Sequence, residues 1–209
     1  MNEPMKPRYT PAEEICNSAS HALGAILAVC STCLLVLNSP STSFAVAAVV
    51  YGLAVFSMFL TSALYHAVRD PGAKAVIRKF DHAMIYFAIA GTYVPILNAV
   101  TSPRESLVWY CGLGLCVLVG AASSFITLKH KYVTTAVYLV MGWASLLLLR
   151  NLWRSAEPVT TYLLIGGGVA YSIGAALYLL KKRFMHAVFH VFVLGGAALQ
   201  YLSIRTFYC

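Results

Sequence analysis

The sequence predicts an all-α integral membrane protein, a bundle of seven transmembrane helices in one domain that spans residues 1–209. Of the 209 residues, 60% are hydrophobic and only 11% are charged, and the mean hydropathy is +0.75. A soluble domain would carry about a quarter charged residues. The apolar residues also fall into runs of about 20, the length that crosses a hydrocarbon core. Both observations predict a polytopic membrane protein.

Seven runs are long and apolar enough to span, and polar or turn-forming segments separate them. The predicted spans are 17–37, 44–67, 80–100, 107–127, 132–151, 160–180 and 185–206. The breaks include the turn-rich segment 38–43, Arg69-Asp70-Pro71-Gly72 and the cationic segment Lys181-Lys182-Arg183. Residues 1–14 form a short polar tail, and the first apolar run is too long for a cleaved signal peptide. Pro95, inside the third span, is expected to kink it.

The basic residues predict the direction of the bundle across the membrane. Of the 15 Lys and Arg residues, 11 fall on the side of the N-terminal tail when the chain crosses seven times. The positive-inside rule then places the N-terminus in the cytoplasm and the C-terminus outside. The net charge of +8 is spread over short interhelical segments. We therefore expect membrane lipids as partners and no nucleic acid.

The six cysteines do not form a recognisable metal or redox motif. Cys30 and Cys33 form a CxxC pair, but no second pair accompanies it, and Cys209 is the last residue. We interpret the cysteines in the spans as ordinary helix-packing residues.

Polar residues gather at the predicted cytoplasmic ends of four spans. His186 and His190 begin the seventh, and their i, i+4 spacing puts both imidazoles on one helix face. Ser62 and His66 have the same spacing at the end of the second, and Asp81 lies at the start of the third. Ionisable side chains are costly in hydrocarbon, so this convergence indicates a functional site.

Three histidines with an open fourth position are a common catalytic zinc site. His66, His186 and His190 can supply the ligands, and Asp81 and Ser62 the polar groups around a water that zinc activates for attack on a carbonyl. Each residue also has a simpler explanation. An HxxxH pair can be two core histidines, His66 can be solvated at the interface, and Asp81 can pair with neighbouring cations.

Three further histidines are weaker candidates. Glu14, Asn17 and His21 share a face of the first span, and we interpret them as a hydrogen-bonded packing cluster, with metal ligation by His21 as the alternative. His82 points about 100° away from Asp81 on the helix. His130, between two lysines in a loop, is expected to be solvated.

Three motifs together resemble the haemolysin III family, the bacterial branch of the progestin and adipoQ receptor (PAQR) superfamily. They are Glu14-x-x-Asn17-x-x-Ser20-His21; Ser62-x-x-x-His66 with Lys79-Phe80-Asp81-His82 and Ala90-Gly91-Thr92-Tyr93; and His186-x-x-x-His190. The resemblance covers nearly the whole chain in order, and the short tail is similar to that of bacterial members. It implies a multi-pass protein of the plasma (bacterial inner) membrane.

The resemblance also implies a seven-helix bundle with its N-terminus inside and zinc near the cytoplasmic face. The implied ligands are His66, His186 and His190; Asp81 would hold the water at the metal, with Ser62 beside it. Glu14, Asn17 and His21 would be structural support. Relatives such as alkaline ceramidases suggest hydrolysis of a lipid amide, whereas the bacterial branch is named for haemolysis and is linked to membrane-energy homeostasis.

Four functions therefore remain open. The first is a zinc-dependent hydrolase that cleaves a lipid amide or ester. The second is a non-enzymatic sensor or regulator of the membrane with structural zinc. Cytolytic activity is the third, although no segment of the sequence indicates a switch from soluble to inserted protein. Proton or ion transport is the fourth, but the polar residues gather at one side and form no path across.

Overall fold

Helices account for nearly all of the computed structural model, which describes residues 9–180 and 182–208. The elements are α1 (Pro11–Leu37), α2 (Thr42–Ala67), α3 (Pro71–Val100), α4 (Pro103–Ile126), α5 (Lys131–Trp143), the 3₁₀ turn η1 (Ala144–Leu148), α6 (Leu149–Ser155), α7 (Pro158–Leu179) and α8 (Met185–Arg205). Residues 1–8 of the tail, Lys181 and Cys209 lie outside the described residues.

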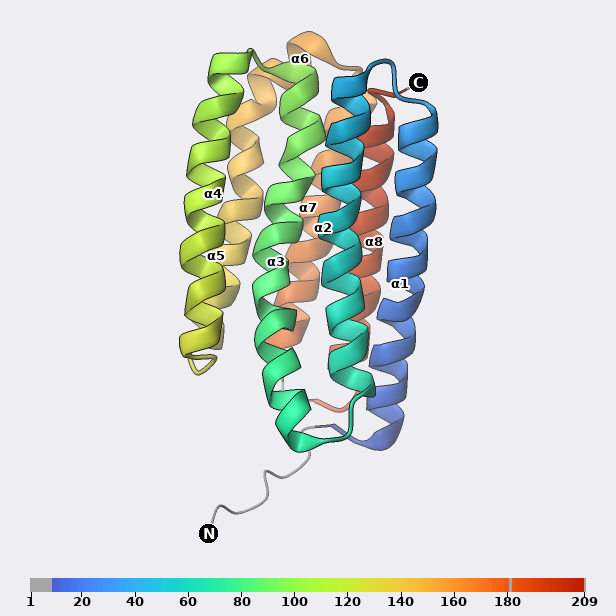
Figure 1. The fold of residues 1–209 in the computed structure, drawn as a ribbon, viewed down its shortest axis with the longest axis vertical. Helices are drawn as coiled ribbons and strands as arrows, with labels where there is room; N and C mark the ends of the chain where they lie inside the picture. Colours follow the sequence, from blue (N-terminus) through green and yellow to red (C-terminus); the bar gives the residue numbers. More distant parts are fainter. Residues whose placement is uncertain (1–8, 181, 209) are drawn as a thin grey trace.

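The described part of the chain contains seven helical segments that are long and apolar enough to cross a membrane, with α5, η1 and α6 counted as one. All seven predicted spans are thereby confirmed. The segments run alternately up and down the bundle (Figure 1). We define the N-terminal end as the end at which α1, α3, α5 and α8 begin and α2, α4 and α7 end. The C-terminal end of α8 lies at the opposite end (Figure 1).

α1 begins at Pro11, six residues before the predicted boundary of the first span at residue 17. Thr10 and Glu13 form a reciprocal capping box. The Thr10 hydroxyl accepts from Glu13 N at 3.3 Å, and the Glu13 carboxylate accepts from Thr10 N at 2.9 Å. These bonds satisfy orphan donors of the first turn. Glu13 also accepts from Phe184 N at 2.8 Å, which attaches the turn before α8 to α1.

α3 begins nine residues before the predicted boundary at residue 80. Asp70 caps the helix by accepting from Ala73 N at 2.7 Å, and Pro71 occupies the first turn, where a missing N–H costs nothing. Its 30 residues span about 45 Å, longer than the hydrocarbon core. The first turns of α3 therefore carry charged residues that hydropathy alone assigns to a loop. The helix continues through Pro95 to Val100.

The fifth span is not one regular helix. The Tyr93 hydroxyl reaches the carbonyls of Met141 and Gly142 at 2.7 and 3.0 Å. In a regular helix these carbonyls accept hydrogen bonds only from backbone N–H groups of the next turn. The 3₁₀ turn Ala144–Leu148 follows directly. A side chain from α3 thus contacts the fifth span where its regular helix ends.

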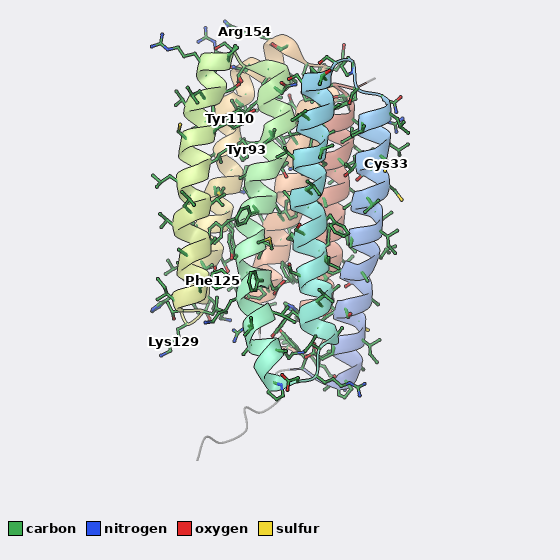
Figure 2. All side chains as sticks on the ribbon, in the orientation of Figure 1. Cys33, Tyr93, Tyr110, Phe125, Lys129 and Arg154 are labelled. Carbon is green, nitrogen blue, oxygen red and sulfur yellow. The ribbon has the colours of Figure 1, made fainter. Side chains whose placement is uncertain are left out.

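Close helix packing and outward apolar faces fit a membrane bundle. A Cβ on Gly91 would lie 2.5 Å from the Ala54 Cβ, so α2 and α3 approach closely there because residue 91 is glycine. In contrast, α4 presents many large apolar side chains outward, among them Leu118. Five cysteines are free and exposed, and Cys33 lies on the outer side of α1 (Figure 2). The CxxC pair thus lies on an outward face of α1.

Candidate metal centre

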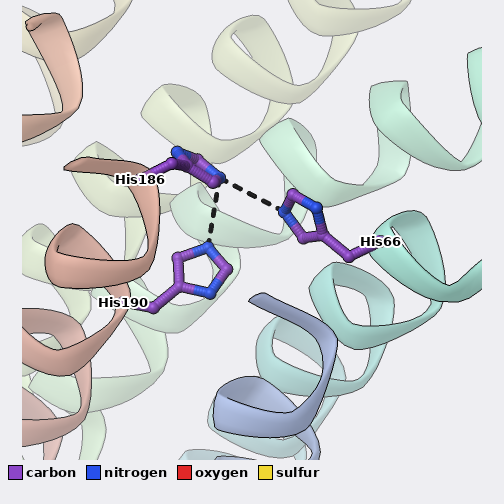
Figure 3. Close-up of side chains that lie close together, drawn as sticks. All are labelled: His66, His186 and His190. Atoms are coloured by element: carbon purple, nitrogen blue, oxygen red, sulfur yellow. Dashed lines mark hydrogen bonds between the residues drawn. The ribbon is translucent and has the colours of Figure 1, made fainter. Parts of the chain in front are cut away.

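The structure brings three of the predicted site residues together at the N-terminal end of the bundle. The Nε2 atom of His186 lies 3.2 Å from His66 Nε2 and 3.2 Å from His190 Nε2 (Figure 3). Among the described residues, these three form a group whose ligand atoms lie within 4.8 Å of one another. Two nitrogen ligands of a tetrahedral zinc are about 3.3 Å apart. The spacing therefore suits a metal ion.

Two helices present the three imidazoles. His66 lies in the last turn of α2 and is 3% exposed, and His190 in α8 is 1% exposed. His186, one turn earlier in α8, is half-buried because it lies at the mouth of the site. The i, i+4 spacing thus places both α8 imidazoles on one helix face, as predicted, and His66 of α2 meets them there.

A carboxylate orients His66. Its Nδ1 lies 2.6 Å from Glu14 Oε2, and Asn17 Nδ2 is 3.4 Å from the same nitrogen. When Nδ1 donates its proton to Glu14, the lone pair of Nε2 faces the other histidines. The second Glu14 oxygen binds Lys74 Nζ at 2.9 Å, so the carboxylate links α1, α2 and α3. This is the carboxylate–histidine arrangement found around protein-bound metals.

His190 is oriented by the backbone of α1. Its Nδ1 lies 3.1 Å from the Asn17 carbonyl oxygen and 3.2 Å from Ser20 Oγ. The Ser20 hydroxyl itself donates to the Asn17 carbonyl at 3.0 Å. An Nδ1–H donated to that carbonyl leaves Nε2 as the free ring nitrogen, so both buried histidines present the same atom to the centre.

The expected hydrogen bonds of Glu14 and Asn17 to His21 are not formed in the described chain. Glu14 and Asn17 bind the two ligand histidines instead of His21. The His21 ring stacks on His190 with centroids 3.5 Å apart, and neither of its nitrogens has a hydrogen-bond partner among the described residues. The alternative, in which His21 is itself a ligand, finds no support, because His21 is not in the metal-ligand group of the described chain.

Asp81 and Ser62 line a cavity that also reaches two of the three clustered histidines, His186 and His190. The cavity has a volume of about 210 Å³ and a mostly apolar lining from α2, α3, α5, α7 and α8. Its lining follows α3 from Arg78 to Ile96, a rise of about 27 Å. On α8 it extends from His186 to Gln200. His186 and His190 thus line the same long apolar cavity as the two predicted polar residues, Asp81 and Ser62.

The other predicted histidines lie elsewhere. His82 lines the cavity but is not in the three-histidine group of the described chain, and its carbonyl accepts from Tyr138 at 2.7 Å. His130 is exposed at the start of α5, as expected. Tyr9 was not singled out from the sequence. Its ring stacks on His186 with centroids 4.9 Å apart, and it also lines the cavity.

In the described chain, seven membrane-length helices and a cluster of two buried histidines and one half-buried histidine that could hold a metal define a class of multi-pass membrane proteins with a candidate intramembrane metal site. A family model described as "Haemolysin-III related" matches residues 9–201, and the chain belongs to this family. The resemblance drawn from the motifs is confirmed.

Curated relatives agree over nearly the whole length. The chain is 31% identical to Hemolysin-3 of Bacillus cereus over 201 residues, which cover 92% of this chain and 90% of the relative. It is 32% identical to a Hemolysin-3 homolog of Bacillus subtilis, with 96% of each protein covered. It is 27% identical to the human monocyte to macrophage differentiation factor, with 96% of this chain and 87% of the relative covered. A bacterial plasma-membrane location is consistent with the Bacillus relatives.

Proposed function

We propose that the protein is a zinc-dependent intramembrane hydrolase that cleaves a lipid amide or ester. One observation carries the proposal: the three Nε2 atoms converge, and two of these histidines line a long, mostly apolar cavity whose lining also includes a carboxylate and a hydroxyl. With the N-terminus in the cytoplasm, as the basic residues predict, this site lies near the cytoplasmic face.

The donor set fits zinc better than a harder cation. Three neutral imidazole nitrogens suit zinc, whereas calcium and magnesium prefer oxygen ligands. Two of the imidazoles already have partners for their outer nitrogens, at Glu14 and at the Asn17 carbonyl. A zinc ion held by His66, His186 and His190 would supply Lewis acidity and a water acidic enough to attack a carbonyl near neutral pH.

The chain's own residues would bind the substrate and move the proton. The apolar cavity binds the acyl chain and keeps bulk water from the carbonyl. Asp81 accepts the proton that the attacking water loses and passes it to the leaving nitrogen or oxygen as the carbon–nitrogen or carbon–oxygen bond breaks. The Ser62 hydroxyl holds the water in place beside Asp81. The products are a carboxylic acid and an amine or alcohol.

Turnover by purified protein tests this function. Zinc-loaded protein in lipid nanodiscs is given a panel of lipid amides and esters, and released fatty acid is measured by mass spectrometry. We expect release by the wild type and none by His186→Ala or Asp81→Asn. Protein with full zinc occupancy that releases no fatty acid from any member of the panel would overturn the proposal.

A regulator with structural zinc is the second candidate, and the Glu14 contacts favour it. This carboxylate joins His66 of α2 to Lys74 of α3, so a metal on His66 would help fasten α1, α2, α3 and α8 together. In that case, Asp81→Asn protein that retains zinc would also retain its cellular phenotype. A hydrolase would lose the phenotype with the same substitution.

The name of the Bacillus cereus relative suggests a third candidate, cytolysis. All seven spans are long and apolar enough for constitutive insertion. A chain with seven such apolar spans is less suited to insert into a membrane from solution. Conductance of liposomes that rises with added, detergent-free protein would favour cytolysis.

A further inference from the structure

Two cationic side chains line the cavity at the N-terminal end of the bundle. Arg78 belongs to α3 and Lys131 to the first turn of α5. The two helices are tied together where Tyr138 donates to the His82 carbonyl at 2.7 Å. Arg78 lies about 6 Å and Lys131 about 10 Å toward the N-terminal end from those two residues. Both cations therefore lie at the same end of the cavity.

The Arg78 guanidinium has an unpaired hydrogen-bond donor in the described chain. Its Nε is buried and has no hydrogen-bond partner among the described residues. A guanidinium offers five donors in a planar fork that matches two oxygens of one phosphate. A buried donor left unpaired is costly, and more so when the group is charged. A ligand oxygen in the cavity would remove that cost.

Lys131 is held at the edge of the same cavity. Its Nζ donates to the Leu179 carbonyl at the end of α7, at 3.3 Å, and lies 4.9 Å from the centre of the Tyr132 ring. The carbonyl fixes the position of the ammonium but leaves it two further N–H groups. The ammonium thus spans from α5 toward α7 with donors available.

The charge of the lining favours an anion. Arg78, Lys131 and Asp81 are the fully charged side chains among the described residues that line the cavity. The proposed function assigns the Asp81 carboxylate to proton transfer. Two positive groups at the mouth of an apolar channel then suit a molecule with a negative head and a hydrocarbon tail.

We propose that Arg78 and Lys131 bind the phosphate of an anionic membrane phospholipid whose acyl chain enters the cavity. The claim that this phospholipid is the substrate rests on the proposed hydrolase function. The claim that it binds at Arg78 and Lys131 does not. Phosphate charge is shared by lipid headgroups and free phosphate, so the experiment separates the two sources.

General attraction of basic residues to anionic lipid surfaces needs a control. Any cation near the interface contributes to such attraction. Lys79 and Lys129 are neighbours of Arg78 and Lys131 in sequence, but neither lines the cavity. Lys129 is exposed and projects away from the bundle at the end of α4 (Figure 2). Their substitution removes the same charge at the same end of the bundle without touching the cavity.

Native mass spectrometry of the zinc-loaded full chain measures the preference directly. Phosphatidylglycerol and phosphatidylcholine with identical acyl chains compete for the protein. We expect the wild type to prefer phosphatidylglycerol and Arg78→Gln/Lys131→Gln protein to lose about tenfold of that preference. Lys79→Gln/Lys129→Gln protein should change less than twofold. Arg78→Lys, which keeps the charge but lacks the fork, should lose part of the preference.

Several results would overturn the proposal. The double variant could keep the wild-type preference, or the control variant could lose as much. A third such result is that millimolar inorganic phosphate binds to the lipid-stripped wild type but not to the double variant, while neither protein prefers one lipid headgroup. Free phosphate would then be the ligand. If the variants melt at the same temperature as the wild type, misfolding is excluded as the cause of a lost phosphatidylglycerol preference.

Turnover separates the failure of this inference from that of the proposed function. If the protein hydrolyses no lipid but the double variant loses the phosphatidylglycerol preference, the hydrolase proposal fails and the phosphate site stands. If wild type and double variant hydrolyse anionic lipids at the same rate, the phosphate site fails and the hydrolase proposal stands.

Discussion

Replacing Glu14 by glutamine tests whether the histidine cluster is arranged for a metal. Glu14 Oε2 lies 2.6 Å from His66 Nδ1. The amide of glutamine keeps the size of the side chain but removes its negative charge. A charged acceptor makes the imidazole a stronger ligand and fixes its orientation, and loss of such a partner typically lowers metal affinity 10- to 100-fold. This range corresponds to about 1.4–2.7 kcal/mol of binding free energy.

The structure favours the upper part of that range. The Glu14 side chain is 20% exposed and His66 is buried, so solvent screens the contact only in part. Glu14 also binds Lys74 Nζ at 2.9 Å, which holds the carboxylate in place without competing for Oε2. We therefore expect a loss of about 30- to 100-fold in zinc affinity for Glu14→Gln.

The assay is competition between the purified protein and a zinc chelator of known affinity. Glu13→Gln is the matched control, since the Glu13 carboxylate binds Thr10 and Phe184 N and no histidine. We expect Glu13→Gln to retain the wild-type affinity within a few-fold. Equal affinities of Glu14→Gln and the wild type would refute the assigned role of Glu14.

Three further predictions follow from individual contacts. Ser20→Ala should lower zinc affinity less than about tenfold in the same chelator assay, because the Asn17 carbonyl remains 3.1 Å from His190 Nδ1. A loss of zinc affinity as large as that of Glu14→Gln would contradict this prediction. Gly91→Val should lower the melting temperature by several degrees because of the 2.5 Å approach to Ala54, whereas Gly112→Val, with no atom within 4 Å, should not. Removal of zinc by a chelator should lower the melting temperature of the wild type but not that of His190→Ala protein, as a thermal-shift assay would show.

The number of spans follows from the sequence because it depends on composition. Runs of about 20 apolar residues are a requirement of the hydrocarbon core, so each run is a helix. Helix ends depend instead on capping. Thr10 and Asp70 begin α1 and α3 within polar segments that hydropathy does not distinguish from loops. At the break in the fifth span, Met141 O accepts from the Tyr93 hydroxyl, 48 residues away along the chain, and no local pattern indicates this contact.

The histidine cluster was predictable for a similar reason. His66, His186 and His190 lie at the same depth once the spans are placed, and the i, i+4 pair fixes one helix face. The role of Glu14 was not predictable, because its partner His66 is 52 residues away and the contact depends on how α1 packs on α2. Its spacing to Asn17 did place both on one face, which is a signal for a shared partner but does not identify it.

Metal analysis of purified protein tests the central claim most directly. Zinc per chain is measured by inductively coupled plasma mass spectrometry for wild type, His190→Ala and the control His130→Ala, whose imidazole is exposed far from the cluster in sequence. We predict about one zinc per chain in the wild type and in His130→Ala, and a content near zero in His190→Ala. Unchanged zinc in His190→Ala, or none in the folded wild type, would contradict the assignment of His66, His186 and His190 as the ligands.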